Sequence, residues 1–239
     1  MIERLLLKLS ARDIVSADEE DALRELIANV ADIPPRRTVL QRGVPLERSI
    51  LLLEGFMCRY KDLRNGRRQI TALHVPGDFL DLHGFTLKQL DHDVMSIGHA
   101  KVAYALHSDL IRLTETLPHL TRLLWFSTNL DAAMHREWEL SLGQRMGAER
   151  AAHLICEIHA RLQIVELVRG NEFDLPLNQA EVGECLGLTV VHTNRVLREL
   201  RERNLAHFSR GRVRIEDLAA LKAFAEFDPT YLYLGRTAR

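Results

Sequence analysis

Seven arginines gather near the end of the chain, in a pattern suited to binding phosphates and the edges of bases. Within residues 189–214 they stand against two acidic residues, Glu199 and Glu202; the arginines are Arg195, Arg198, Arg201, Arg203, Arg210, Arg212 and Arg214. A guanidinium group donates two parallel hydrogen bonds, a geometry that matches phosphate oxygens and the edge of guanine. A like-charged stretch is also common on a solvated face, so the elements that carry these arginines decide between the two interpretations.

The same stretch predicts a pair of helices joined by a tight turn. Asn178 followed by Glu181 is typical of a capped helix start, and Gly187 ends that helix. Thr189 then caps a second helix that continues through Arg203. A short helix, a glycine turn and a longer helix form a helix-turn-helix, which places its second helix in the major groove of DNA.

Gly183 is the small residue expected where the two helices cross closely. The apolar residues expected to fill the space between them are Val182, Leu186, Leu188, Val196 and Leu200. Two packed helices without any such purpose are the alternative interpretation, and the basic residues around them argue against it.

The flanking residues predict a wing. Residues 205–208 and 212–215 are typical of two short strands, joined by the basic turn Ser209-Arg210-Gly211, and residues 173–177 supply a further strand. We therefore predict a winged helix-turn-helix at residues 178–215, with double-stranded DNA as its partner.

Histidines in the first half of the chain raise a second kind of chemistry, metal binding. They are His74, His83, His92, His99 and His107, accompanied by Asp81, Asp91 and Asp93. Asp81 and His83 alternate as two ligands on one strand face would. A cupin-like metal enzyme, however, needs a His-x-His pair with a downstream Glu and His, which the sequence lacks. We expect surface or hydrogen-bonded histidines, no metal site and no enzyme.

Composition limits the class of protein. The 239 residues carry a net charge of −1, with 46% hydrophobic and 27% charged residues, which is ordinary for a globular protein of two domains. Cys58, Cys156 and Cys185 are too far apart for a CxxC pair, which favours a reducing cytoplasm. Cys58 could sense redox state on a strand, but an inert buried thiol is the expectation. Neither a leader nor a run long enough to span a membrane is visible, so a soluble cytoplasmic protein is expected.

The first half of the chain predicts a β-rich domain. A capping box at Ser16–Glu19 opens a helix to about Val30, and short β-type runs follow from Thr38 to about His107. Asn65-Gly66 is typical of a two-residue type I′ hairpin turn. Short strands at this spacing predict an antiparallel β-barrel or jelly roll.

A long helix is predicted next, from Thr116 to about Ser141. Its apolar stripe contains Leu120, Leu123, Leu124, Leu130, Met134 and Trp138, with Ser127 among them. Such a stripe often faces its own domain, but on a helix between two domains we expect a twin helix to cover it. The expected dimer interface is Leu120, Leu123, Ser127, Leu130, Met134 and Trp138. The predicted α+β protein has a sensor domain (1–115), a dimerisation helix (116–145) and a DNA-binding domain (146–239).

This order of barrel, long helix and winged helix resembles the Crp/Fnr family of regulators. The resemblance covers nearly the whole chain and is most specific at Leu186-Gly-Leu-Thr-Val-Val-His-Thr-Asn-Arg-Val-Leu, which is close to the family's recognition helix. Leu53-Glu-Gly and Val75-Pro-Gly-Asp match it in the barrel. The family implies a homodimer joined by the long helix, whose sensor controls the pose of two recognition helices.

The resemblance also assigns DNA contacts. Arg195 stands where the family places its guanine-reading arginine, and Val191 stands where many relatives carry a glutamate. The amide of Asn194 suits adenine, and the methyls of Val191 suit thymine. Gln179, Thr189 and His192 are expected at phosphates, and the expected DNA contacts also include Arg198 and Arg210.

Two departures bear on the effector. Relatives that bind cyclic AMP carry Gly-Glu-x-x-x-Leu and then Arg-Ser or Arg-Ala, whereas this chain has Gly77-Asp78 and then Leu90-Asp91-His92-Asp93. A cyclic phosphate would meet carboxylates there, so cyclic AMP is disfavoured. Cysteines before Cys58 are absent, which disfavours an iron–sulfur cluster.

Gly77 and Asp78 are the expected effector pocket, and no cofactor is predicted. A constitutive, ligand-independent regulator and a small-molecule module without DNA are the alternatives, the second disfavoured by the arginines. An unidentified small-molecule effector and RNA polymerase stay open as partners.

Overall fold

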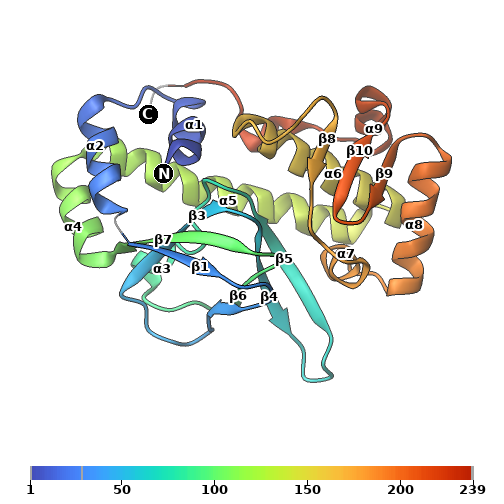
Figure 1. Ribbon diagram of the computed structural model, residues 1–239, viewed down its shortest axis with the longest axis horizontal. Helices are drawn as coiled ribbons and strands as arrows, with labels where there is room; N and C mark the ends of the chain where they lie inside the picture. The colour runs from blue at the N-terminus through green and yellow to red at the C-terminus, as the bar shows by residue number, and fades with distance from the viewer. Residues whose placement is uncertain (1, 28, 238–239) are drawn as a thin grey trace.

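The N-terminal half carries short helices and two antiparallel sheets (Figure 1). The computed structural model describes residues 2–27 and 29–237. The elements are α1 (Glu3–Ser10), α2 (Ala17–Leu26), β1 (Asn29–Ile33), β2 (Thr38–Leu40), β3 (Arg48–Glu54), β4 (Met57–Asp62), β5 (Arg68–His74), α3 (Gly84–Leu87), β6 (Asp93–Ser96) and β7 (Ala100–Leu106). One sheet has the strand order β1-β7-β3, and the other has the order β2-β6-β4-β5.

These sheets do not close into the barrel that we expected. In the described residues each sheet keeps its own edges, and the chain crosses between them at Gly55. Gly55 has a φ of 86°, and a Cβ there would lie 2.3 Å from the carbonyl oxygen of His99, so only glycine fits the crossing. Ile50 and Val102 from one sheet share a buried cluster with Met57 and Val94 from the other, so the sheets face each other across a core.

Local details of this half follow the sequence in part. The expected strands from β2 to β7 are confirmed, and the capping box between Ser16 and Glu19 opens α2. The helix ends at Leu26 instead of about Val30, while Ala28 lies outside the described residues. The type I′ turn is wrong: of its two central residues only Gly66 has a positive φ, and the loop spans 63–67. Helix α1 and strand β1 were not predicted.

The second half confirms the expected long helix and winged helix-turn-helix. Its elements are α4 (His107–Thr116), α5 (Pro118–Gln144), α6 (Gly147–Ile164), β8 (Glu172–Asp174), α7 (Gln179–Leu186), α8 (Val190–Glu202), β9 (Ala206–Ser209), β10 (Arg212–Ile215), α9 (Leu218–Phe224) and the 3-10 helix η1 (Pro229–Leu232). The third sheet has the order β8-β10-β9. Within the described residues, no helix has the length and apolar character that crossing a membrane requires.

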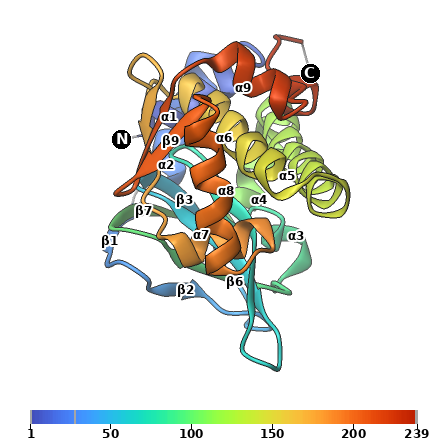
Figure 2. The ribbon, with the colours of Figure 1, turned by 90° about the vertical axis from the view of Figure 1, so that its right-hand side faces the viewer.

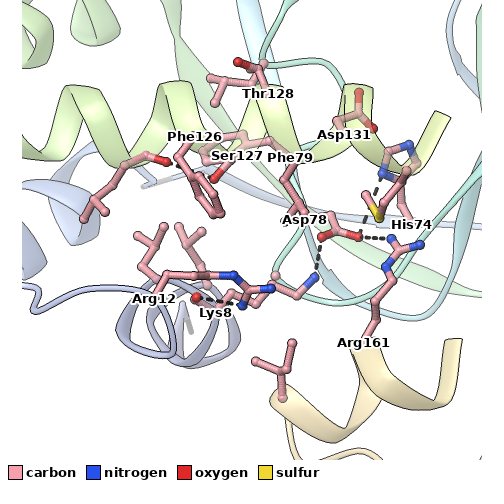
Figure 3. A pocket seen from close by; sticks show the side chains of 18 of the residues that line it. Lys8, Arg12, His74, Asp78, Phe79, Phe126, Ser127, Thr128, Asp131 and Arg161 are labelled. Carbon is pink, nitrogen blue, oxygen red and sulfur yellow. Dashed lines mark hydrogen bonds and ion pairs between the residues drawn. The ribbon is translucent and has the colours of Figure 1, made fainter. Parts of the chain in front are cut away.

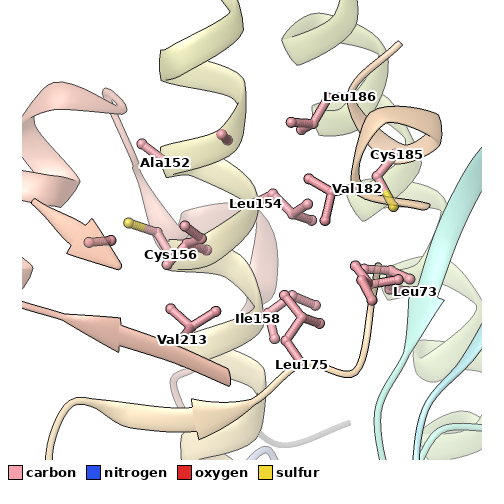
Figure 4. Close-up of a cluster of buried hydrophobic side chains, with 14 of the residues drawn as sticks. Leu73, Ala152, Leu154, Cys156, Ile158, Leu175, Val182, Cys185, Leu186 and Val213 are labelled. Atoms are coloured by element: carbon pink, nitrogen blue, oxygen red, sulfur yellow. The ribbon is translucent and has the colours of Figure 1, made fainter. Parts of the chain in front are cut away.

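The two halves share one hydrophobic core. Leu73 of β5 belongs to the same buried cluster as Leu154 and Ile158 of α6 and Val182 of α7 (Figure 4). Leu73 is 1% exposed and Ile158 is fully buried, so the contact excludes water. Burial of a leucine-sized side chain is worth about 1.5–3 kcal/mol, so this contact holds the helix-turn-helix against the sheet.

The end of the chain returns to its beginning. After α9 the chain runs along α5 through η1, and the ring of Tyr233 meets that of Phe126 edge to face. A guanidinium NH of Arg12 donates to the carbonyl of Leu232, and the amide of Thr237 donates to the carbonyl of Arg12. The segment 228–237 therefore joins the C-terminal half to the turn that follows α1.

A buried ion pair fixes α5 on the sheets. Arg59 of β4 is 2% exposed; it donates twice to the carbonyl of Leu80 and forms an ion pair with Asp131 of α5. Burial alone would raise the pKa of Asp131, but Arg59 outweighs it and the pKa lies below its ordinary value. The long helix is thereby set against β4.

Gly183 sets how closely the two helices of the motif cross. A Cβ at this position would lie 2.7 Å from the carbonyl oxygen of Leu188 and 2.9 Å from Oγ1 of Thr193. The crossing expected from the sequence is therefore confirmed, because no larger residue fits without a shift of the backbone.

Removing the charge of Asp131 should strongly destabilise the protein. Asp131→Asn leaves Arg59 buried without a carboxylate, and we expect a loss of about 3 kcal/mol in the free energy of unfolding, measured by urea denaturation. The matched control is Asp91→Asn, because the pair of Asp91 with Lys61 is exposed; it should cost under about 1 kcal/mol. Equal losses in the two variants would contradict this assignment.

Adding one methyl group at Gly183 should destabilise the helix-turn-helix. Gly183→Ala forces the α7–α8 crossing apart, and we expect a loss of about 1–3 kcal/mol in thermal or urea unfolding. Gly235→Ala serves as the control because a Cβ there meets open space. A Gly183→Ala protein as stable as the control would show that the crossing is looser than described.

Candidate nucleic-acid interface

Side-chain caps hold the two helices of the motif in place. Asn178 accepts from the amide of Glu181 and Glu181 accepts from the amide of Asn178, the reciprocal capping box that the sequence predicts. Gly187 ends α7 with a φ of 65°, and Thr189 then accepts from the amide of His192 to start α8. The motif thus turns within three residues, and α8 lies at the right-hand end of the molecule in Figure 1, the side that faces the viewer in Figure 2.

The predicted DNA contacts lie on the outer side of this motif. Val191 is 74% exposed, which is unusual for an apolar side chain outside a contact surface. Asn194 is half-buried, and the other predicted contact residues are exposed: Gln179, Thr189, His192, Arg195, Arg198 and Arg210. Arg210 stands between β9 and β10 with a φ of 51°, at the tip of the wing.

Ion pairs divide the arginine cluster into two groups. Arg203, Arg212 and Arg214 are paired with Glu199, Asp174 and Glu216 at 2.6–3.1 Å. In the part of the chain that the structure describes, Arg195, Arg198, Arg201 and Arg210 have no such partner. The unpaired group projects from α8 and the wing tip, and these four charges are available to an anionic partner.

Residues of the N-terminal half brace α7, which the sequence did not indicate. Arg36 forms two contacts with the carboxylate of Glu181, at 3.0 and 3.2 Å, and that side chain is 7% exposed. The side-chain amide of Gln69 donates to the carbonyls of Glu184 and Cys185. These pairs become visible only in the folded structure, because 145 residues separate Arg36 from Glu181 in the sequence.

Gly77 and Asp78 lie beside a cavity, but Asp78 is already bound. Its carboxylate accepts from Lys8 of α1, from Arg161 of α6 at 2.9 Å, and from the amide of Val75. Burial alone would raise the pKa of Asp78, yet the two cations hold the pKa below its ordinary value. Gly77 has a φ of 89°, and a Cβ there would lie 2.7 Å from the carbonyl of Arg4. Both residues therefore contact α1 and hold it in place.

Within residues 90–93, two side chains face a different space, a groove between α5 and the sheet. Asp91 and His92 line this groove together with Lys61 and His135. The Asp91 carboxylate is paired with Lys61 at 2.6 Å and with His92 at 2.8 Å. The two segments that stand where relatives carry their cyclic-AMP motif thus line two different spaces.

Cys58 and three of the five histidines, His74, His92 and His107, are buried, while His83 is half-buried and His99 is exposed. In residues 2–27 and 29–237, no three His, Cys, Asp or Glu side chains are arranged to hold a metal ion. His83 lies with its ring 5.5 Å from that of His92, and burial, with Arg59, lowers its pKa to about 4. Cys58 is fully buried, and burial raises the pKa of its thiol to about 12, which leaves little reactive thiolate.

The stripe expected at the dimer interface packs in part against the chain's own core, with Leu120 and Leu123 buried and its other four members half-buried. Leu120 and Leu123 are fully buried in a cluster with α1, α2 and β7. The other members are Ser127 and Leu130, which line the cavity beside Asp78, and Met134 and Trp138, which contact the core shared by the two halves. The exposed face of α5 instead carries Trp125, Asn129, Ala132, Arg136 and Leu140.

Comparisons with known proteins agree with this geometry. A family model described as a Crp-like helix-turn-helix domain matches residues 149–224. The transcriptional activator FnrA of Stutzerimonas stutzeri is 24% identical over 214 residues, covering 88% of this chain and 86% of that protein. The nitrogen fixation regulation protein FixK of Bradyrhizobium diazoefficiens is 27% identical over 174 residues, covering 73% and 72%.

Solved structures carry the same fold. FixK2 from Bradyrhizobium japonicum superimposes with a TM-score of 0.76 at 24% identity, over 83% of this chain and 98% of that chain. The regulator CLP of Xanthomonas campestris, which is described as c-di-GMP responsive, gives a TM-score of 0.64 at 14% identity. The match covers 84% of this chain and 100% of that chain. These relatives are named as regulators, residues 149–224 are a Crp-like helix-turn-helix domain, and the chain is similar over most of its length to transcription regulators of the Crp/Fnr family.

Proposed function

We propose that the protein is a homodimeric transcription regulator that binds an inverted-repeat operator through α8 and the wing. The observation that carries the proposal is the set of exposed, unpaired arginines on α8 and the wing tip, within a matched Crp-like domain. The relatives FnrA and FixK are named as a transcriptional activator and a regulation protein, which supports a role in transcription. RNA polymerase is a natural further partner of such a regulator.

Three residues of α8 read bases in this proposal. Arg195 donates two hydrogen bonds to guanine, worth about 1–3 kcal/mol of discrimination. Asn194 offers its amide to adenine. Val191, 74% exposed, has no hydrogen-bonding group and contacts a thymine methyl.

The other contacts set the register without reading sequence. Gln179 and Thr189 stand at the helix starts, where backbone amides also face a phosphate. His192, Arg198 and Arg210 extend the contact along the backbone, with Arg210 at the wing tip.

The dimer forms through the exposed face of α5. Trp125 is 66% exposed and Leu140 is 49% exposed, and the intervening residues of the face fall at steps of three and four. The apolar side chains of this face, Trp125, Ala132 and Leu140, would be buried by a second copy of the same helix. Two recognition helices related by a two-fold axis enter successive major grooves about 34 Å apart, so the operator is an inverted repeat.

We further propose that the regulator is cytoplasmic and needs neither cyclic AMP nor an iron–sulfur cluster. The three cysteines are buried and unpaired, which supports a reducing compartment and leaves no cluster ligands near the N-terminus. The carboxylate of Asp91 in the groove disfavours a cyclic phosphate. Tight binding of cyclic AMP in calorimetry would contradict this part of the proposal.

Two substitutions separate base reading from phosphate binding. Arg195→Ala should weaken binding to an operator selected from random DNA by about 1–3 kcal/mol and relax the preference for one guanine. Gln179→Ala should weaken binding to every sequence alike. Gel-shift titration at one salt concentration measures both, with Arg112→Ala on α4 as the control. If Arg195→Ala keeps the selected site and the affinity, α8 does not lie in the groove as proposed.

Charges placed on the outer face of α5 should separate the dimer. Trp125→Glu with Leu140→Glu replaces the two large apolar side chains of the proposed interface by negative charges, and we expect monomers in sedimentation equilibrium. Leu87→Glu is the matched control, since Leu87 of α3 is 62% exposed and lies off α5. A protein that remains a dimer after the double substitution would refute this interface.

A further inference from the structure

We propose that the C-terminal segment 228–237 is a strap that holds α6, and with it the recognition helix α8, at one angle to α5, and that Tyr231 is its main positioning residue. The strap thereby sets which spacing of two half-sites a dimer binds. The part about half-site spacing rests on the proposed function. The hold of the strap on α6 stands on contacts within the chain.

The direct connection between α5 and α6 is short. Helix α5 ends at Gln144 and α6 begins at Gly147, and residues 145–146 between them have extended backbones. Two extended residues allow the second helix to tilt against the first, so other contacts must fix the angle. Glu137 of α5 binds Arg145 at 2.8 Å, but a contact so close to the connection resists tilting over only a short lever arm.

The strap is a second connection between the two helices. On α6, the ring of Tyr231 and that of Phe227, just before the strap, lie with their centroids 6.0 and 5.1 Å from the ring of His153. On α5, the ring of Tyr233 meets that of Phe126 at 6.0 Å. Aromatic rings at these separations attract each other. The strap therefore packs on both helices at once.

The far end of the strap is anchored a long way from the first connection. Phe126 and the end of α5 are 18 residues apart, which is about 27 Å of helix at about 1.5 Å per residue. Leu232 is 1% exposed and its carbonyl accepts from Arg12, while the amide of Thr237 donates to the carbonyl of Arg12. A restraint at this distance limits tilting more than one beside the connection, because its lever arm is longer.

A buried carboxylate joins the strap to both helices. Glu157 of α6 is fully buried, and it accepts from the hydroxyl of Tyr231 at 3.0 Å, from Nε1 of Trp138 of α5 at 3.1 Å and from Arg161 at 3.0 Å. Burial raises the pKa of Glu157, and the three donors act in the opposite direction. A buried carboxylate that loses a donor is destabilised, so the hydroxyl of Tyr231 has one favoured place relative to both helices.

The same network continues to the sheet. Arg161 also donates to the carbonyl of Leu73 in β5 at 2.7 Å and to the carboxylate of Asp78 at 2.9 Å. Figure 3 shows this carboxylate held by Arg161 and by Lys8 of α1. The strap, α5, α6 and the sheet are thus joined by consecutive polar contacts, so loss of the contact at Tyr231 also loosens α6 against the sheet.

The angle of α6 fixes the place of the recognition helix. Val196 and Leu200 of α8 belong to the same buried cluster as Ile158 of α6, so α8 moves with α6. In a dimer built on α5, the two angles set the separation of the two recognition helices, which must match major grooves about 34 Å apart. A protein that holds this separation before binding loses less conformational freedom on the operator and tolerates other spacings poorly.

Gel-shift titration of the full chain against operators whose half-site spacing differs by single base pairs tests the positioning role. The unsubstituted protein should prefer one spacing at least tenfold. In Tyr231→Phe and Leu232→Asp this preference should fall at least threefold, while the affinity for a single half-site stays within twofold. Tyr233→Phe and Leu234→Asp are the matched controls, because these neighbours are 51% and 40% exposed, and both should keep the preference.

Two outcomes overturn the positioning role. One is an unchanged spacing preference in Tyr231→Phe and Leu232→Asp. The other is an equal loss of affinity for the operator and for the single half-site, which a merely structural residue would give. If Leu232→Asp fails to fold, Tyr231→Phe decides, since it removes a single hydroxyl.

Hydrogen exchange without DNA tests the hold of the strap on α6. Amides of α6 and α7 should exchange at least threefold faster in Tyr231→Phe and Leu232→Asp than in the two controls. Faster exchange confined to α1 and the strap overturns this hold. A protein that shows the expected exchange but binds no DNA would refute the proposed function and leave the strap in place, so the two failures are distinguishable.

Discussion

The half-buried carboxylate of Asp78 holds three distant parts of the chain together. It binds Lys8 of the first helix, Arg161 of the first helix after α5, and the amide of Val75 in its own turn. Arg161 in turn reaches the carbonyl of Leu73 and the carboxylate of Glu157. A buried ion cluster of this kind adds little net stability over apolar packing, but it tolerates few alternative arrangements. It fixes the place of α6, and α7 and α8 follow from α6.

The position of the recognition helix α8 is set by the packing of α6 and α7 against the sheet, and not by the sequence of α8 itself. Leu73 joins the sheet to α6 and α7, and Gln69 and Arg36 hold α7 from the side. Movement of α8 relative to α5 therefore requires a hydrophobic contact and several hydrogen bonds to break together. Such coupled contacts have few intermediate arrangements, which makes the junction a suitable element for switching between two poses.

Local signals were readable from the sequence, and the partners of buried faces were not. Caps such as Ser16–Glu19 and Asn178–Glu181 involve residues three apart, and the crossing glycine Gly183 stands within the motif it serves. The stripe on α5 correctly marked a face with buried residues, but periodicity does not say which neighbour covers such a face. Part of the stripe, including Leu120 and Leu123, is covered by residues of the same chain. Asp78 was identified as a pocket residue, yet its cations lie 70 and 83 residues away and were not foreseeable.

The return of segment 228–237 to α1 changes what counts as a folding unit. The sequence divides neatly at the long helix, but hydrogen bonds from Thr237 and to Leu232 tie the last residues to Arg12. An isolated DNA-binding half would lose these bonds and expose the side of α6 that carries Leu154 and Ile158. Cooperative unfolding of the whole chain, rather than two separate transitions, follows from that closure, and so does protection of the C-terminal end from proteases while α1 stays in place.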